Sequence, residues 1–559
     1  MVIFLISAIL ALDWAVIPPS QQTVRDPQTG ISVHVAVDGF RIARTETSQQ
    51  VYEQVMGQNP SLHKGPNLPV ENVNWLNAVR FANALSVRNK LNPCYETIRH
   101  ITATASRKTS CNGYRLPTEA EWSAAAGTSD GNLGLASTKN ASALGKLPGT
   151  RPIGSSEPNA FGVYDMSGNV WAWCEDWLYA IQSPWPVTNP RGPRRGLQRV
   201  IRGGSYVTSR TSWSRGLRSS QDPAHSSGET GFRLVQSTGE RPPAIPFDQA
   251  AYRKPPQKSD FPALAPVTKV DRTKWMLLLG APAIAKPAPR ARLVREIDDT
   301  WLRARLMDLQ TEPDSWERIL IVYPDEHVTT PRPVLIVPYY DVDTPAGLNL
   351  GGRNFQPLGV RSFAWLAAQQ GYIAVAIRWF GESYGQRYDE AVANLARRHP
   401  GTTGLGKWVW DASRLLDYLE TLPEVDRTRI AMMGHSLGGK MTMYAAAMDQ
   451  RVRAAVASEP GVSFAFTNYE DYWYFGERLP KGVDQNELLA LLAPRPFLLI
   501  AGEDSDGDKS LPLLTSASAM PRSVFDWINH RSGHTPAPDA ITAAFDWLRH
   551  WLLDGVPKQ

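Results

Sequence analysis

The stretch Arg429–Lys440 (RIAMMGHSLGGK) constrains this chain most, because an apolar run ends there in a serine set between glycines. Gly434, Ser436 and Gly438 form the pattern Gly-x-Ser-x-Gly, and good helix formers fill residues 441–448. A strand that turns sharply into a helix with a serine at the apex is the geometry of a nucleophile elbow. Side chains at the two glycines would crowd the neighbouring strand or helix. The pattern predicts Ser436 as a catalytic nucleophile, and the alternative is a glycine turn with a surface serine.

Length and composition set the broad class of protein. A chain of 559 residues is too long for one hydrophobic core, so we expect two or more domains. A hydrophobic content of 42% and a charged content of 20% are typical of globular proteins. The net charge of +5 is small and no basic run stands out, so nucleic-acid binding is not predicted.

The apolar run Val2–Leu12 lies at the start of the chain and has the length of the apolar part of a signal peptide. It predicts a signal peptide over residues 1–19 and a secreted or periplasmic protein. The alternative is a buried first strand in a cytoplasmic protein. This run and the later run 275–285 are both too short to span a bilayer, so no transmembrane anchor is predicted.

Residues 20–237 carry mixed signals that predict an irregular α+β domain. Apolar residues recur at helical spacing over 46–56 and 75–87. The segment Pro117–Trp122 (PTEAEW) is typical of a helix start, since a proline and acidic residues fill its first turn. After it, Gly, Asn, Ser and Trp dominate, as in a domain built from turns and aromatic packing.

Motifs in a fixed order connect this half to a known family. They are PVENVNW (69–75), GYRLPTEAEW (113–122), NAFGVYDMSGNVW (159–171), RGGSY (202–206) and GFR (231–233). Together they resemble the formylglycine-generating, sulfatase-modifying enzyme family over roughly residues 30–237. The resemblance implies a C-type-lectin-like fold that is rich in loops.

The oxidase chemistry of that family is not expected here. Its oxidase members use two cysteines shortly after the RGGS motif to bind copper, and the matching positions hold Thr208 and Trp213. Neither residue supplies a thiolate ligand. The stretch that matches the family's calcium site, Asn169–Ala172, lacks its carboxylate. We therefore predict no cofactor and no metal.

The three cysteines are Cys94, Cys111 and Cys174. Cys94 and Cys111 flank a polar insertion and could close it as a disulfide in an exported protein. Two reduced, buried thiols are the alternative. Cys174 lies in the aromatic run WAWCEDW and is expected to be a small buried hydrophobic residue.

Residues 238–300 are rich in Pro, Lys, Ala and Gln and predict a linker that packs against a domain near Trp275. Residues 301–559 alternate strand-like and helical patterns, which predicts a mostly parallel sheet covered by helices on both faces. Strands are expected at 301–309, 316–323, 334–340, 372–377, 454–457, 497–500 and 523–527, and helices at 358–370, 407–422 and 540–553. With the elbow at its centre, this half resembles the α/β-hydrolase fold.

A serine nucleophile needs a base and an acid that orients the base. His534 follows the strand at 523–527, where this fold presents its base, and His530 is the nearby rival. The segment 502–508 (GEDSDGD) offers the acid; Asp506 is the first choice, because the turn at Gly507 can aim it at His534. The alternative acids are Asp504 and Glu459, which follows an earlier strand.

Other groups complete the predicted site. The oxyanion hole is expected to combine the backbone N–H groups of Leu437 and Tyr340. Trp379, Lys440 and Trp473 lie in the elbow helix or in loops after strands, where they could contact a sugar. For the aromatic residues, a packed lid without ligand specificity is the alternative.

The second half is similar to the dienelactone-hydrolase and acetyl-xylan-esterase group and, more distantly, to glucuronoyl esterases. In glucuronoyl esterases an arginine follows the nucleophile, where this chain has Leu437, whereas Lys440 matches their elbow lysine. The sequence predicts a serine carboxylic-ester hydrolase that acts on a small-molecule or glycan ester. The alternatives are a glycan- or partner-binding protein with a silent hydrolase scaffold, and a peptidase similar to prolyl oligopeptidases.

Overall fold

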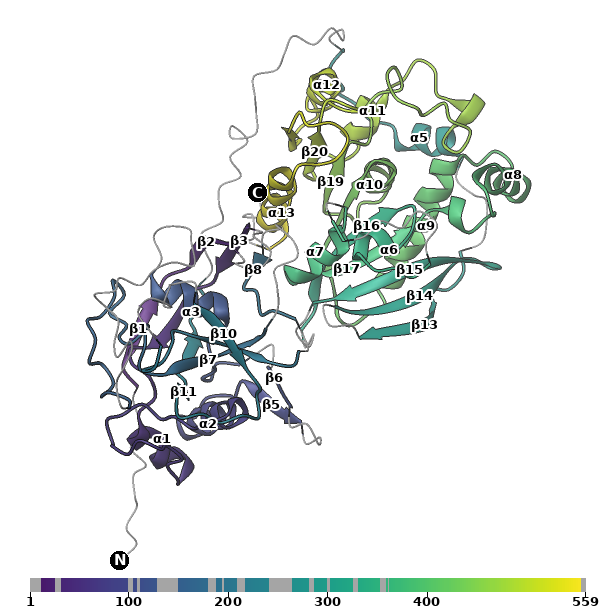
Figure 1. The fold of residues 1–559 in the computed structure, drawn as a ribbon. Helices are drawn as coiled ribbons and strands as arrows, with labels where there is room; N and C mark the ends of the chain where they lie inside the picture. Colours follow the sequence, from purple (N-terminus) through teal and green to yellow (C-terminus); the bar gives the residue numbers. More distant parts are fainter. Residues whose placement is uncertain are drawn as a thin grey trace, which may run out of the picture. The chain divides into compact units, whose positions relative to one another are not determined.

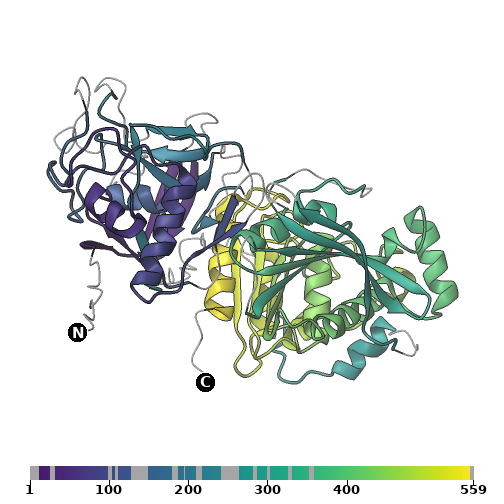
Figure 2. The ribbon, with the colours of Figure 1, turned by 90° about the horizontal axis from the view of Figure 1, so that it is seen from below.

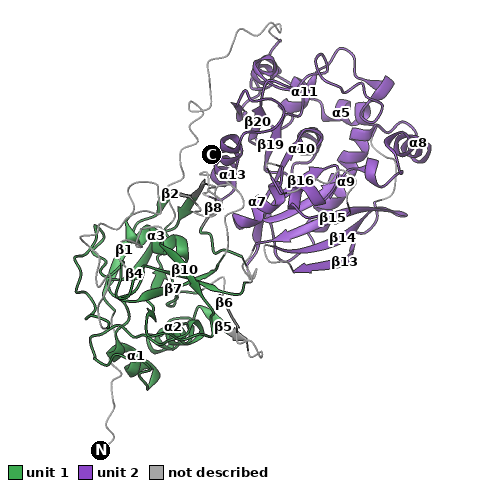
Figure 3. Cartoon of the chain, viewed as in Figure 1, with its two compact units in different colours: residues 1–243 green, residues 244–559 purple. Residues whose placement is uncertain are grey.

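The computed structural model divides the chain into two compact units, Met1–Pro243 and Ala244–Gln559 (Figure 3). It describes residues 12–25, 32–98, 104–107, 111–127, 149–178, 187–193, 196–208, 217–240, 264–280, 286–298, 302–324, 330–351, 358–359 and 361–553. Within these ranges, no helix has both the length and the hydropathy of a membrane span.

The first unit combines short helices with small sheets (Figure 1). The helices are α1 (Gln49–Met56), α2 (Trp75–Arg88) and α3 (Glu119–Ala126). One sheet has the order β1 (Trp14–Ile17), β4 (Phe40–Ala43), β12 (Val235–Ser237), and another has the order β10 (Arg218–Gln221), β9 (Arg199–Arg202), β7 (Trp171–Trp177), β11 (Thr230–Gly231). Smaller sheets join β2 (Ser20–Arg25), β3 (Ser32–Val37) and β8 (Val187–Thr188), and β5 (Tyr95–Ile98) with β6 (Thr104–Arg107). This mixed architecture confirms the predicted α+β domain.

Helix α3 starts where the PTEAEW pattern predicts. The Thr118 hydroxyl accepts a hydrogen bond from the Glu121 N–H at 3.1 Å, and the Glu121 carboxylate accepts one from the Thr118 N–H at 2.9 Å. This capping box satisfies N–H groups that have no partner inside the helix.

Aromatic residues organise the core of the first unit. The indole of Trp75 donates to the Cys174 carbonyl at 2.9 Å, and the Arg199 guanidinium lies between the rings of Trp75 and Trp177 at 3.8 and 3.6 Å. Cys94 and Cys111 form a disulfide, which settles the alternative that the sequence left open. Cys174 is free and buried, as predicted.

The second unit is built on one nine-stranded sheet. Its order is β13 (Ala291–Asp298), β14 (Arg303–Glu312), β15 (Ser315–Tyr323), β17 (Ile373–Arg378), β16 (Arg332–Tyr339), β18 (Val425–His435), β19 (Ala454–Ser458), β20 (Phe497–Ala501), β21 (Phe525–Asn529). The pairs from β13 to β17 are antiparallel, and those from β17 to β21 are parallel. The sheet is therefore mostly parallel, as predicted.

Helices cover both faces of this sheet (Figure 2). The helices of this unit are α5 (Arg272–Leu279), α6 (Asp343–Ala346), α7 (Phe363–Gln369), α8 (Tyr388–Arg398), α9 (Gly404–Leu419), α10 (Leu437–Met448), α11 (Gln485–Ala490), α12 (Leu511–Ala517) and α13 (Pro538–Leu552). Residues of α9 and α10 share one hydrophobic core with strand residues such as Ile336, Val375 and Leu499. The described residues of α7 and α13 contact strands of the same sheet but contribute nothing to that core, so these helices cover the other face.

Two predicted domain boundaries are wrong. Residues 238–300 are not linker throughout, because β13 is a strand of the large sheet. The predicted packing near Trp275 is confirmed, since Trp275 on α5 is buried with 1% exposure. The start at residue 20 is also too late, since β1 pairs with β4 and buries Ala15 and Ile17. The apolar run of the predicted signal peptide, except Leu12, lies outside the described residues.

Candidate active site

Ser436 stands at the apex between β18 and α10, with φ 56° and ψ −116°. Residues other than glycine rarely adopt this conformation, and nucleophile elbows use it to present the serine hydroxyl. A Cβ atom on Gly434 would collide with the carbonyl of Gly438, and one on Gly438 would collide with the carbonyl of Pro338 on β16. The glycines therefore permit the turn in the way that the sequence predicts.

His534 lies beside this turn. Its ring centroid is 4.7 Å from that of His435, the residue directly before Ser436. Burial lowers the pKa of His534, the Asp504 carboxylate opposes that shift, and the Arg361 charge adds to it. A neutral imidazole next to a serine is what a general base requires. No hydrogen bond joins Ser436 Oγ to His534 in the described part of the chain, and such bonds commonly form only when substrate binds.

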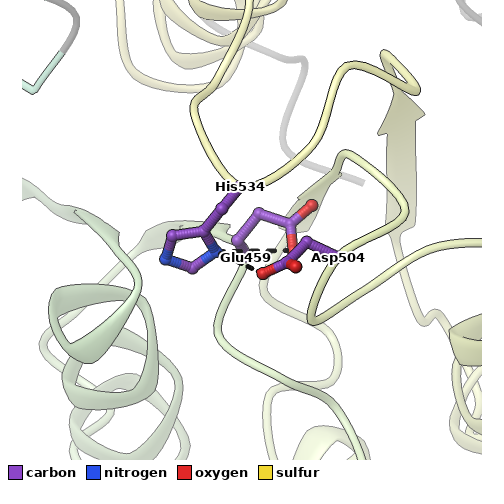
Figure 4. Close-up of side chains that lie close together, drawn as sticks. All are labelled: Glu459, Asp504 and His534. Carbon is purple, nitrogen blue, oxygen red and sulfur yellow. Dashed lines mark ion pairs between the residues drawn. The ribbon is translucent and has the colours of Figure 1, made fainter.

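Two carboxylates face the ring of His534 (Figure 4). Asp504 Oδ2 lies 3.1 Å from His534 Nδ1, and Glu459 Oε2 lies 4.0 Å from the same atom. The Asp504 contact is short, but its alignment is too poor for a hydrogen bond, so it is an ion pair when His534 is protonated. The structure therefore brings His534 together with both of the alternative acids.

Asp506, the first choice from the sequence, does not contact His534. It accepts hydrogen bonds from the N–H groups of Gly461 at 2.5 Å and Val462 at 2.7 Å, and from the Ser510 hydroxyl at 2.8 Å. These bonds hold the loop after β19 against the loop after β20. The turn at Gly507 thus directs Asp506 into the protein interior, and the prediction of Asp506 as the partner of His534 is wrong.

Glu459 has a structural role as well as its place near His534. Its fully buried carboxylate accepts hydrogen bonds from the N–H groups of Gly502, Ser505 and Asp506 and so shapes the turn that carries Asp504. Burial and the charge of Asp506 raise the pKa of Glu459 to about 8, while the backbone donors act in the opposite sense. Near neutral pH, Glu459 therefore carries less than a full negative charge toward His534.

The ligand atoms of Glu459, Asp504 and His534 lie within 4.8 Å of one another, a spacing that could also hold a metal ion. A metal ion bound there would occupy His534 Nδ1, the nitrogen that faces the carboxylates. The cluster is therefore suited either to orienting His534 as a base or to holding a metal ion, but not to both at once.

The predicted oxyanion donors lie on adjoining elements. Leu437 begins α10, where the first N–H groups have no intrahelical acceptor. Tyr340 directly follows β16, and the ring of Tyr339 lies 3.6 Å from where a Cβ of Gly438 would be. The end of β16 thus packs on the elbow, as an oxyanion hole built from both segments requires.

The predicted substrate-binding residues differ in their environments. Trp379 is buried with 2% exposure and packs against Tyr340 and Tyr388, so it supports the rings around it. Trp473 is half-buried against Tyr388. Lys440 is buried, donates to the Pro460 carbonyl at 2.5 Å and lies 4.1 Å from the Tyr469 ring centroid. Of these three, Trp473 offers the most accessible side chain.

The remaining histidines near the elbow have other partners. His435 is buried, and its Nδ1 lies 3.1 Å from the Ser458 hydroxyl, so it braces the turn. His530 Nδ1 lies 2.7 Å from the Ser532 hydroxyl, and the structure shows no ion pair between His530 and a described carboxylate. His534 is thus the better placed of the two histidines that the sequence offered as a base.

Sequence reasoning missed Arg361, whose charge acts on His435, His534, Tyr339 and Tyr340. It precedes α7 in the connection after β16. A connection that follows a central strand of a parallel sheet is a usual place for site residues, but no motif marks this arginine.

In the first unit, no cysteine is available for copper. Two of the three cysteines of the chain form the disulfide, and burial raises the pKa of the Cys174 thiol well above its usual range. Thr208 hydrogen-bonds the Ser205 N–H at 2.9 Å, and Trp213 lies outside the described residues. Asn169 Oδ1 accepts from the Arg151 N–H at 2.9 Å. The described residues at these positions therefore offer no thiolate pair for copper.

Comparison with known proteins identifies both regions. A profile of the family "Sulfatase-modifying factor enzyme 1-like domain" matches residues 17–238, and a profile of "Glucuronyl esterase, fungi" matches residues 395–470, which include the elbow.

Individual relatives agree with the first profile. Over 212 residues the chain is 31% identical to the "Chaperone protein LppX" of Paenibacillus barcinonensis, a match that covers 32% of this chain and 72% of that protein. It is 31% identical to the formylglycine-generating enzyme of Thermomonospora curvata, covering 32% of this chain but only 59% of that enzyme.

The solved glucuronoyl esterase from Solibacter usitatus overlaps 52% of this chain and 99% of its own, at 17% identity and a TM-score of 0.40. The chain therefore belongs to the sulfatase-modifying factor enzyme 1-like family through its first unit, which is joined to a second unit with a glucuronoyl-esterase-like region.

Proposed function

We propose that the second unit is a serine carboxylic-ester hydrolase that acts on esterified carbohydrate. The observation that carries this proposal is the strained backbone of Ser436 at the strand–helix turn, with His534 and its carboxylates beside it. The match of residues 395–470 to glucuronoyl esterases supports an ester of a sugar as the substrate.

The proposed reaction follows from these positions. Ser436 Oγ attacks the ester carbonyl carbon while His534 takes the hydroxyl proton, and Asp504 stabilises the resulting imidazolium. The N–H groups of Leu437 and Tyr340 receive the charge on the tetrahedral oxygen. His534 returns its proton to the departing alcohol, and water then hydrolyses the acyl-enzyme by the same steps.

Aromatic side chains near the site suit a sugar ring. Tyr340, Tyr388 and Trp473 are half-buried, Tyr472 is exposed, and Trp379 packs beneath the first two. Aromatic faces stack on the apolar faces of sugars while hydroxyls at the edge bond to polar groups.

The first unit is proposed to be a docking domain without oxidase activity, since it lacks thiolates for copper. The peptidase alternative gains no support, because the first unit belongs to the sulfatase-modifying factor family and is not a propeller.

A substrate panel tests the proposal. The full chain and Ser436→Ala are incubated with p-nitrophenyl acetate, acetylated xylan oligosaccharides and methyl esters of glucuronoyl oligosaccharides. We expect hydrolysis of at least one glycan ester and loss of it in Ser436→Ala. The control Ser518→Ala should retain it fully, because the exposed Ser518 hydroxyl bonds to the Thr515 carbonyl at 2.8 Å. Equal hydrolysis by wild type and Ser436→Ala would exclude the proposed mechanism.

A further inference from the structure

Arg361 has no assigned role, yet it lies among the residues around Ser436. Its side chain donates a hydrogen bond to the Tyr339 hydroxyl, and the Tyr339 ring lies 3.6 Å from where a Cβ of Gly438 in the elbow would be. Tyr339 and Tyr340 stack edge to face with their centroids 5.2 Å apart. Arg361 is therefore tied to the end of β16, the segment that supplies one proposed oxyanion donor.

The segment that carries Arg361 is anchored on both sides of it. The Ser362 hydroxyl donates to the Thr344 carbonyl at 3.1 Å and accepts from the Gly359 N–H at 3.1 Å. Directly after Ser362, α7 packs on β16 and β17. Arg361 is half-buried and its backbone is held by these packed elements. A guanidinium fixed in this way can stabilise charge on a reacting group without first moving into position.

A second cation near the site is placed differently. Lys440 also acts on His534, but its ammonium bonds to the Pro460 carbonyl and lies over the Tyr469 ring. The charge of Arg361 acts instead on Tyr339, Tyr340 and both histidines beside the elbow. Arg361 is therefore a cation that acts both on the end of β16 and on the two histidines beside Ser436.

We infer that Arg361 is a catalytic residue whose guanidinium stabilises the oxyanion of the tetrahedral intermediate, together with the N–H groups of Leu437 and Tyr340. This inference rests on the proposed ester hydrolysis. The side chain directly after Ser436 is an uncharged leucine. Arg361 would therefore supply a positive charge to the elbow from another part of the chain. An arginine guanidinium carries five N–H donors in a fixed fork, a geometry suited to contacting an oxyanion.

The test uses the full chain and p-nitrophenyl acetate, which has no charge that Arg361 could bind in the ground state. We expect Arg361→Gln to lower kcat by about 100-fold with a smaller change in KM, the size of effect seen when an oxyanion donor is removed. Loss of its charge should also raise the pKa of His534, so the acid limb of the kcat/KM profile should move to higher pH.

Matched variants separate this role from a structural one. Tyr339→Phe removes the hydrogen bond but keeps the guanidinium, so it should retain most of kcat. Arg361→Ala should regain activity when guanidinium ion is added, and Arg361→Lys should keep more activity than Arg361→Gln, which a loss of folding alone would not produce. The exposed Arg387→Gln serves as the control for removal of an arginine.

A kcat for Arg361→Gln within about threefold of wild type, with an unmoved acid limb, would overturn the inference. So would equal losses in Arg361→Gln and Tyr339→Phe without rescue by guanidinium. If wild type hydrolyses no ester, or if Ser436→Ala is equally active, the proposed function fails instead, so the two failures are distinguishable.

Discussion

Asp504→Asn should lower kcat strongly at neutral pH, because it removes the carboxylate closest to the base. Asp504 Oδ2 lies 3.1 Å from His534 Nδ1, and the Asp504 side chain is 55% exposed. At that separation two unit charges attract by about 1 kcal/mol in water and about 5 kcal/mol near a protein surface. Because Asp504 is half in water, we expect about 1–4 kcal/mol, which corresponds to a loss of about 5- to 1,000-fold in kcat.

The second carboxylate makes this loss depend on pH. Glu459 Oε2 lies 4.0 Å from His534 Nδ1, and burial raises its pKa to about 8. As pH rises through that value, Glu459 ionises and can take over the stabilisation of the imidazolium. The kcat of Asp504→Asn should therefore approach that of wild type above about pH 8, whereas the double variant Asp504→Asn/Glu459→Gln should not recover.

The assay is hydrolysis of p-nitrophenyl acetate from about pH 6 to about pH 9, with Tm measured for each variant. Asp506→Asn serves as the control, because Asp506 bonds to backbone N–H groups and should lower Tm rather than kcat. A larger loss of kcat in Asp506→Asn than in Asp504→Asn, at unchanged Tm, would refute this reasoning. An unchanged kcat for Asp504→Asn at neutral pH would refute it as well.

Three further outcomes are expected. The acid limb of the pH profile of kcat/KM should have its midpoint below about pH 6.5, because burial lowers the pKa of His534. A midpoint above that value would contradict the assignment of His534 as the buried base. Replacing Cys94 and Cys111 by serine should destabilise the first unit by about 3 kcal/mol in denaturant unfolding, given a sequence separation of 17, and an unchanged midpoint would show that the disulfide contributes nothing. The chain incubated with copper and a sulfatase-motif peptide should leave the peptide cysteine unchanged in mass, since no thiolate pair is available; conversion to the aldehyde would overturn the assignment of a non-oxidase domain.

Features that depend on local patterns could be predicted from the sequence. The elbow was predictable because a strand, glycines at fixed offsets and a helix must coincide there. The start of α3 followed from its capping pattern, which satisfies specific N–H groups. The position of His534 followed from the order of strands, because the base of this fold lies after a late strand.

The carboxylate that faces His534 could not be predicted, since its position depends on the shape of one turn. Asp504 and Asp506 are two residues apart, and the bonds from Glu459 to the turn decide which one faces His534. The edge strand β13 was missed because most of its side chains are exposed, which removes the apolar alternation that marks a strand. Arg361 was missed because its position follows from contacts distant in sequence, which no local pattern encodes.

Covalent labelling tests whether Ser436 is an activated nucleophile. The full chain is treated with a fluorophosphonate probe, digested and analysed by mass spectrometry. We expect a phosphonate adduct on the peptide that contains Ser436, formed in wild type and in Ser518→Ala, strongly slowed in His534→Ala and absent in Ser436→Ala. An adduct on another serine, or equal labelling of wild type and Ser436→Ala, would contradict it.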